Sequence, residues 1–442
     1  MFLNRGFLPR AGFALLVLLA AWALQTAQGP GASPRPLAAP APGLPGEQGA
    51  TGGHWAPVAR GTIPMPLGVP AAHASVLVAM PAGDSAALTA FWFAGDRESA
   101  PNVQIAASRF DRALQTWSPA QMVVNRHAMG AQLGFGLRRL GNPVAWVDAR
   151  GRMPLFVVAT GWGGWAASRV LHLRQAPDSS ASDLQFEPLR VLPLSWLWNL
   201  SYLVRTAPLP LADGGMVLPA YFELGAKTPV ALRFDAEGEW LGMARMSQRR
   251  HQLQPALLAT SATDWLALLR DTRPNGKIGV AQTHDGGQTW FDAPDLPLDN
   301  PDAGVASLSV GAQHLLVFNP STFSRQGLRL ARSADGAQWA TERDLEDGVP
   351  GQEFSYPAMA WADRSLWVSY TDQRKSIAWQ RLDWVADGGP AAPAAAQLAP
   401  ASTPASTPAS TPASASASAS ASAQSAAASA PASAAPTIRA KP

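Results

Sequence analysis

Two carboxylates stand in contexts where they could do acid and base chemistry. Glu98 lies in the polar stretch FAGDRESAPNV after an apolar run, and Glu223 ends the segment PAYFE. Enzymes that cleave glycosidic bonds place a carboxylic acid and a carboxylate on either side of the bond. Glu98 could therefore act as the acid and Glu223 as the base. The structural alternative is that Glu98 pairs with Arg97 and that Glu223 caps a strand edge near Lys227.

Tryptophan is unusually abundant, with 17 residues against four tyrosines. Trp162 and Trp165 lie in GWGGW, and Trp196 and Trp198 lie in SWLW. These loop-like surroundings are compatible with an aromatic plate for a sugar ring. Large aromatic side chains more often fill protein interiors, so core packing is the competing expectation.

Residues that bind metals or cofactors are scarce. The chain has no cysteine, which excludes disulfides, thiolate nucleophiles and cysteine-ligated metals. Its seven histidines show neither HxH nor HxxxH spacing, so we expect no catalytic metal and no cofactor. A calcium ion on loop oxygens stays open.

The elements that must position these residues are short strands. No stretch shows a sustained 3.6-residue apolar stripe with helix caps at both ends. Apolar runs are instead separated by turn residues at short, even intervals, which favours an all-β, six-bladed β-propeller over a single sandwich. The clearest runs are 75–80, 88–93, 155–158, 216–222 and 315–318.

A repeated turn motif supports the propeller. The segment 283–290 (THDGGQTW) follows the pattern Ser/Thr-x-Asp-x-Gly-x-Thr-Trp, 333–339 (SADGAQW) repeats it one residue short, and 108–117 (SRFDRALQTW) is a looser copy. In such a hairpin, Asp285 can accept hydrogen bonds from turn amides, and the glycines permit positive φ. We expect these turns to be structural and to lie on blade rims.

Four regions follow from composition along the chain. Residues 1–27 carry basic residues before a 14-residue apolar run, which predicts a signal peptide or an uncleaved signal anchor. Residues 28–54 are rich in Gly, Pro and Ala and predict a linker, and 388–442 predict a disordered tail of Ala, Ser, Thr and Pro. Residues 55–387 then form the propeller. We expect an exported protein that is periplasmic, secreted or anchored to a membrane and faces outside the cytoplasm.

The basic excess lies at the chain ends. Although the formal net charge is +3, five of the 34 basic residues but only one of the 31 acidic residues lie in the terminal regions. The propeller region is therefore nearly neutral, and nucleic acid is excluded as an expected partner.

Residues 73–381 resemble the bacterial sialidase-like (neuraminidase) family, whose members carry this Asp-box motif. The resemblance implies that arginines grip a substrate carboxylate, a task that suits the planar guanidinium fork. It places Arg270, which ends a strand before an Asp-box, and Arg325 in these roles, with Arg329 as the alternative to Arg325. It places Tyr356 as the nucleophile.

The sequence departs from the family pattern at three places. His73 stands where the first arginine is expected, which weakens the carboxylate grip. Gln254 stands where a glutamate should activate Tyr356, and an amide cannot accept the proton. Asn102 is near the position of the acid/base aspartate, with Asp96 or Glu98 as substitutes, of which we favour Glu98.

Three functions are compatible with these residues. The first is an exported sialidase-like exo-glycosidase that acts on terminal acidic sugars of glycans or polysaccharides. The second is a carbohydrate-binding propeller without catalysis, used in handling cell-surface polysaccharide. The third is a structural or protein-binding propeller that carries its ligand on the Ala/Ser tail.

Overall fold

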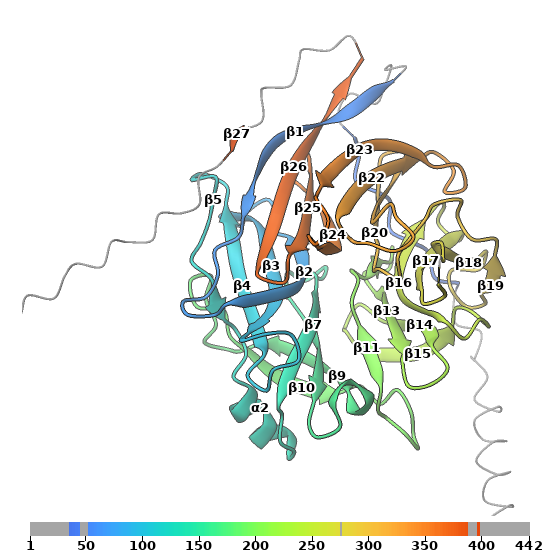
Figure 1. Cartoon of the computed structure of the whole chain (residues 1–442). Helices are drawn as coiled ribbons and strands as arrows, with labels where there is room; N and C mark the ends of the chain where they lie inside the picture. Colours follow the sequence, from blue (N-terminus) through green and yellow to red (C-terminus); the bar gives the residue numbers. More distant parts are fainter. Residues whose placement is uncertain (1–34, 45–51, 275, 388–395, 398–442) are drawn as a thin grey trace, which may run out of the picture. The chain divides into compact units, whose positions relative to one another are not determined.

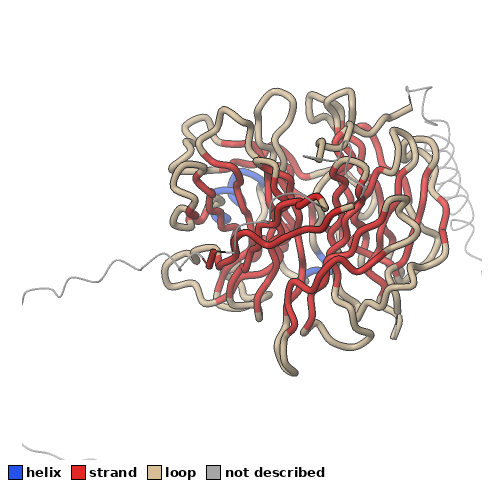
Figure 2. Tube along the Cα trace, turned by 90° about the horizontal axis from the view of Figure 1, so that it is seen from above, coloured by secondary structure: helices blue, strands red, loops and turns tan. Residues whose placement is uncertain are grey.

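Six small antiparallel sheets form a closed ring, and almost all of the regular structure is strand (Figures 1 and 2). The computed structural model describes residues 35–44, 52–274, 276–387, 396 and 397. The prediction of an all-β, six-bladed propeller of the sialidase type is confirmed. The predicted signal segment lies outside the described residues, as do all but two residues of the predicted tail.

Each sheet is one blade, numbered in chain order from the innermost strand outward. Blade 1 contains β2 (Ala71–Ala79), β3 (Ala86–Gly95), β4 (Gln104–Asp111), β5 (Thr116–Trp117) and β6 (Gln121–Met122). Blade 2 contains β7 (Arg139–Ala145), β8 (Leu155–Thr160), β9 (Arg169–Gln175) and β10 (Phe186–Val191). Blade 3 contains β11 (Tyr202–Val204), β12 (Leu209–Pro210), β13 (Met216–Phe222), β14 (Thr228–Phe234) and β15 (Trp240–Arg245).

The second half of the ring repeats this arrangement. Blade 4 contains β16 (Gln252–Ala259), β17 (Trp265–Asp271), β18 (Gly279–Thr283) and β19 (Phe291–Ala293). Blade 5 contains β20 (Ala306–Val310), β21 (Gln313–Phe318), β22 (Gly327–Ser333) and β23 (Ala340–Asp347). Blade 6 contains β24 (Phe354–Ala362), β25 (Ser365–Asp372), β26 (Ser376–Ala386), β1 (Gly53–Thr62) and β27 (Ala396–Gln397).

The first strand of the chain closes the ring. β1 pairs antiparallel with β26 from Gly53 opposite Ala386 to Thr62 opposite Ala378, and the two strands lie side by side in Figure 1. Blade 6 is thus built from both ends of the propeller segment. The pairing of β1 with β26 ties the two ends of the propeller segment together.

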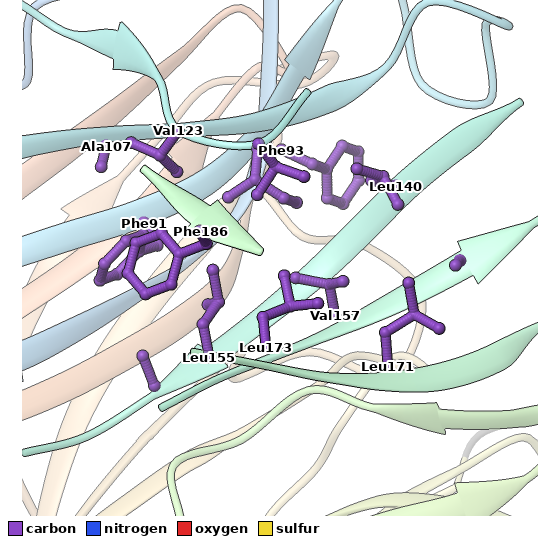
Figure 3. Packing of buried hydrophobic residues seen from close by; sticks show 14 of the residues in the cluster. Phe91, Phe93, Ala107, Val123, Leu140, Leu155, Val157, Leu171, Leu173 and Phe186 are labelled. Atoms are coloured by element: carbon purple, nitrogen blue, oxygen red, sulfur yellow. The ribbon is translucent and has the colours of Figure 1, made fainter. Parts of the chain in front are cut away.

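The core lies between neighbouring blades. Every residue of β3 and of β8 is buried, which explains why these segments read as continuous apolar runs rather than as an alternating pattern. Figure 3 shows side chains of β3, β7, β8 and β9 packed together. The rings of Phe91 and Phe186 meet edge to face, with their centroids 5.8 Å apart. Burial on both sheet faces stabilises each blade through its neighbours.

The only helices among the described residues are α2 (Arg126–Leu133) and the short η1 (Gly164–Ala167). The Asn125 side chain caps α2 by accepting from the amides of His127 and Ala128. The helix ends at Gly134, whose φ of 73° is the left-handed conformation that glycine adopts readily.

The turns that carry the repeated motif connect the third and fourth strands of blades 1, 4 and 5. In blade 4, the Asp285 carboxylate accepts hydrogen bonds from the amides of Gln288 and Thr289, both at 2.9 Å. The Trp290 indole donates to the Gly287 carbonyl at 2.9 Å. The motif therefore fixes a tight hairpin at the blade rim.

Part of the predicted linker packs on the propeller. Residues 35–44 run along turns between first and second strands, where Ala38 is buried and donates to the carbonyl of Ala262 at 2.8 Å. Gly311 donates to the carbonyl of Pro42 at 2.7 Å. Composition did not anticipate these contacts, because they are backbone hydrogen bonds that any residue can make.

Candidate functional site at the propeller mouth

One face of the ring collects the predicted functional residues. Strands alternate in direction within a blade, so the start of the first strand, the end of the second and the loop to the third all lie at the same face. We call this face the mouth. It receives the end of β17 with Arg270, the start of β2 with His73, the start of β16 with Gln254, the start of β24 with Tyr356, the β21–β22 loop with Arg325, the β3–β4 loop with Glu98 and Asn102, and the end of β13 with Glu223.

β-Bulges aim residues of four inner strands toward this face. One extra residue is inserted in β2, β7, β16 and β24, at the points where the pairing register shifts. A positive φ occurs at each bulge, at Ala74, Asn142, Gln254 and Tyr356. Bulges turn a side chain away from the regular pleat and are common beside functional sites. Gln254 and Tyr356 therefore occupy equivalent places in blades 4 and 6.

Arg270 joins its own blade to the loop that leads into blade 5 and to blade 6. Its Nε donates to the Asp302 carboxylate at 2.6 Å, and its Nη1 donates to Gln254 Oε1 and to the Tyr356 hydroxyl, both at 3.2 Å. The side chain is 15% exposed. Burial opposes its charge, but Tyr356 and Asp302 outweigh burial and raise the pKa of Arg270. The guanidinium is therefore a fixed positive charge.

The Tyr356 ring is surrounded by cationic groups and a histidine. The guanidinium carbons of Arg205 and Arg325 lie 5.0 and 5.8 Å from its centre, and His73 meets it edge to face at 4.5 Å. These contacts hold the phenol in one place. The structure thus brings Tyr356, Arg270, Arg325, His73 and Gln254 together.

No carboxylate hydrogen-bonds the Tyr356 hydroxyl within the part of the chain that the structure describes. The nearby amide of Gln254 donates to the Tyr221 hydroxyl at 3.3 Å and accepts from Arg270. Burial, with the charge of Glu223, raises the pKa of Tyr221 well above its ordinary value, so this second phenol stays neutral. Tyr356 therefore has a cationic neighbour where a base would be needed.

Arg325 is joined to Glu98 through a chain of ion pairs. Arg325 donates to Glu353 at 3.3 Å, Glu353 accepts from Arg374 at 2.9 Å, and Arg374 also pairs with Glu98. Burial would raise the pKa of Glu353, but Arg374, Ser355 and Arg325 lower it to about 2. Glu98 is therefore paired at the mouth, with Arg374 rather than with Arg97.

Two buried cationic or basic groups lie beneath the mouth. Burial, with the charge of Arg374, lowers the pKa of His73 to about 3, and neither ring nitrogen has a hydrogen-bond partner among the described residues. Burial also lowers the pKa of Arg205 to about 10, and this guanidinium donates to the Pro357 carbonyl at 2.9 Å. At neutral pH, His73 is uncharged and Arg205 is charged.

The remaining candidates lie farther from Tyr356 in the contact network. The Asn102 side chain accepts from the amide of Asp96 at 3.3 Å, so it shapes the β3–β4 loop. The amide of Glu223 donates to the Ser201 carbonyl at 3.0 Å at the edge of blade 3. Arg329 pairs with Asp344 at 2.6 Å on the outer strands of blade 5. Of the two arginines considered there, it is Arg325 that reaches Tyr356.

Sequence reasoning missed four charged residues of this cluster: Arg205, Asp302, Glu353 and Arg374. Glu353 was visible only as a neighbour of Tyr356, and Arg374 stands in a turn of blade 6 that reaches the site only because β2 lies beside it. The amide of Ala72 in β2 donates to the carbonyl of Arg374 at 3.2 Å. The Pro that follows Asn142, Gln254 and Tyr356 is a local signal that would have related these bulge positions.

Within the described residues, no group of three or more His, Asp or Glu side chains is arranged to hold a metal ion. In the same residues, no helix combines the length and the apolar character needed to cross a bilayer.

Residues 86–388 match the family described as BNR repeat-like domain. The chain belongs to this family. No curated protein matches it significantly. The match covers β3 to β26 and the mouth residues from Glu98 to Arg374, whereas β1 and β2, with His73, precede it.

Solved structures share the fold of this BNR repeat-like domain. A sialidase from Trypanosoma rangeli in complex with sialic acid matches with a TM-score of 0.56 and 13% identity, over 75% of this chain and 59% of that chain. A protein of unknown function from Dyadobacter fermentans matches with a TM-score of 0.58 and 15% identity, over 74% and 98%. The NanB sialidase of Streptococcus pneumoniae matches with a TM-score of 0.51 and 11% identity, over 72% and 69%. This chain thus spans about 60% of the length of the trypanosomal sialidases.

Proposed function

We propose that the mouth binds the carboxylate of a terminal acidic sugar, such as a sialic or uronic acid. The observation that carries this proposal is the convergence of Arg270 and Arg325, from blades 4 and 5, on Tyr356 from blade 6. Two guanidinium groups at one point favour a carboxylate, which each can bind through paired N–H donors.

Donors remain for such a ligand. Among the described residues, neither Nη2 of Arg270 nor Nε of Arg325 has a hydrogen-bond partner. Three of the four guanidinium groups around Tyr356 pair with three carboxylates, whereas Arg205 hydrogen-bonds only the Pro357 carbonyl among the described residues, so its charge favours an anionic ligand. The four are Arg205, Arg270, Arg325 and Arg374, and the three are Glu98, Asp302 and Glu353.

The similarity to sialidases supports a glycan as the ligand. The trypanosomal enzyme of the same fold is known in complex with sialic acid. Fold alone does not assign chemistry, and here the likeness adds to the arginine geometry.

Hydrolysis of the bound sugar is the second candidate function. It is favoured by the phenol of Tyr356 beside the arginines and by Glu98 at the same mouth. Tyr356 would act as the nucleophile, Glu98 as the acid and Glu223 as the base. Gln254 opposes it, since an amide in the base position accepts no proton from Tyr356. Binding therefore requires less of the site than catalysis.

The remaining predictions concern location. We propose export through residues 1–27, as a cleaved signal or a retained anchor, with the propeller in residues 55–387 and a low-complexity tail in 388–442. The protein would then meet its glycan in the periplasm, outside the cell or at a membrane surface.

The test measures binding and turnover with the same full chain. Calorimetric titration with N-acetylneuraminic acid, glucuronic acid and neutral galactose should show saturable binding of an acidic sugar and none of galactose. A fluorogenic sialoside, assayed with wild type and Tyr356→Phe, separates the two functions. Binding without turnover supports recognition alone, and turnover lost in Tyr356→Phe supports catalysis. Failure of every acidic sugar to bind at millimolar concentration would reject the proposal.

A further inference from the structure

Three tryptophans beside the mouth are exposed, contrary to the usual preference for burial. Trp162 in the β8–β9 loop is 84% exposed, and Trp196 and Trp198 in the β10–β11 loop are 66% and 53% exposed. By contrast, five other tryptophans of the propeller are almost fully buried: Trp55, Trp92, Trp265, Trp367 and Trp379. Exposed aromatic surface that gathers in one region indicates a binding role.

Both tryptophan loops lie on the mouth face. The β8–β9 loop follows the second strand of blade 2, as the β3–β4 loop with Glu98 follows the second strand of blade 1, and the β10–β11 loop leads into an innermost strand. A direct contact joins the two neighbouring blades, because the Trp165 indole donates to the Ser99 hydroxyl at 3.2 Å. Ser99 is adjacent to Glu98 in the sequence. The first tryptophan loop therefore lies next to the β3–β4 loop that carries Glu98.

Hydrogen bonds connect the two tryptophan loops to each other. The amide of Ser201 donates to the Ser168 carbonyl at 2.8 Å, and the Ser168 hydroxyl donates to the Tyr202 carbonyl at 3.1 Å. Ser168 directly follows η1 of the first loop, and Ser201 follows the second loop. The two loops that carry the exposed indoles are thus joined at the boundary between blades 2 and 3.

The Trp162 indole and the backbone of the second tryptophan loop are also held in place locally. The Arg138 guanidinium lies 4.2 Å from the centre of the Trp162 ring, and the Ser195 hydroxyl accepts from the amide of Trp198 at 3.1 Å. The Asn199 side chain donates to the Leu192 carbonyl at 2.7 Å. Such preorganisation lowers the entropy lost when a ligand binds.

We infer that Trp162, Trp196 and Trp198 form a platform for the sugar rings that follow the acidic terminal sugar. The apolar face of a pyranose fits an exposed indole, whereas its hydroxyls keep their contact with water. The preferred ligand is then an acidic oligosaccharide rather than a free acidic monosaccharide. This inference rests on the proposed function, which places the acidic terminal sugar at the arginines. It assigns the following sugars to a surface separate from the arginine site.

The test compares a monosaccharide with an oligosaccharide that has the same terminal sugar. Calorimetry with N-acetylneuraminic acid, with sialyllactose and with a longer sialylated oligosaccharide should show that affinity rises with length. Trp162→Ala, Trp196→Ala and Trp198→Ala should each weaken oligosaccharide binding about 3- to 10-fold and leave monosaccharide binding unchanged. Phe291→Ala is the matched control, since Phe291 is 55% exposed on β19, the outermost strand of blade 4.

Each outcome decides between the surface and the site. Equal affinities for short and long ligands, or tryptophan variants that weaken both alike, would overturn the platform. If acidic monosaccharides fail to bind, the proposed function fails, and the platform is then judged on neutral oligosaccharides alone. Binding of these that the tryptophan variants remove would support the platform, and absence of binding would reject it. Sedimentation velocity covers self-association: a change in oligomeric state without a change in sugar affinity would also overturn it.

Discussion

Replacing Arg270 by lysine keeps one positive charge at the mouth but removes the planar fork. Lysine can still pair with Asp302, while the two bonds from Nη1 to Gln254 and Tyr356 are lost. A hydrogen bond to a charged group stabilises the folded state by about 1.5–3 kcal/mol. Because Asp302 keeps a partner and water can reach the mouth, we expect the free energy of unfolding to fall by about 1–3 kcal/mol.

The effect on ligand binding should be similar in free energy to the effect on folding. Loss of one paired guanidinium–carboxylate contact should weaken an acidic sugar about 10- to 100-fold. Titration calorimetry measures this, and the midpoint of thermal unfolding should fall by about 1–2 °C for each kcal/mol of lost stability in a domain of this size. Arg329→Lys is the matched control, because Arg329 pairs with Asp344 at 2.6 Å away from Tyr356. Equal weakening of binding in both variants, or none in Arg270→Lys, would show that the Arg270 guanidinium does not bind the sugar carboxylate.

Three further predictions test the neighbours of Tyr356 and the blade turns. His73 has a folded pKa of about 3 against 6.5 when exposed, so the unfolded chain binds its proton first and stability falls as the pH drops below 6.5, by up to about 1.4 kcal/mol per unit. His73→Phe should remove about 2–3 kcal/mol of the stability difference between pH 7 and 4.5 in urea unfolding, and identical pH dependence would contradict this. Gln254→Glu should raise turnover of a fluorogenic sialoside at least about tenfold, unless Tyr356→Phe is also present; unchanged turnover would show that a missing base is not what limits the site. Gly287→Ala should cost about 1–3 kcal/mol, because φ is +82° and the added methyl would lie 2.7 Å from a buried tryptophan ring, whereas Gly83→Ala has open space and should be nearly neutral.

Local sequence patterns predicted most of the fold. Apolar runs and turn residues predicted the strands, and the repeated turn motif predicted the blade rims. The contacts of residues 35–44 could not be foreseen, because they depend on backbone groups of distant turns. The exposure of Trp162, Trp196 and Trp198 reverses the expectation of core packing, since burial depends on the partners that the ring supplies and not on the residue type alone.

The candidate site was only partly predictable for the same reason. Tyr356, Arg270 and Arg325 could be assigned because the segments around them resemble motifs of the sialidase family. Arg374 could not, because it meets Glu98 across 276 positions of the chain and only closure of the ring brings them together. Ion pairs between distant loops leave no periodic pattern in a sequence.

The proposal that Arg270 and Arg325 bind the ligand can be tested by a crystal structure of the full chain with a saturating acidic monosaccharide. The sugar carboxylate should lie within about 3 Å of guanidinium nitrogens of both arginines, with the sugar ring beside Tyr356. A sugar bound at another place, or a mouth that stays empty while the sugar binds in solution, would contradict it.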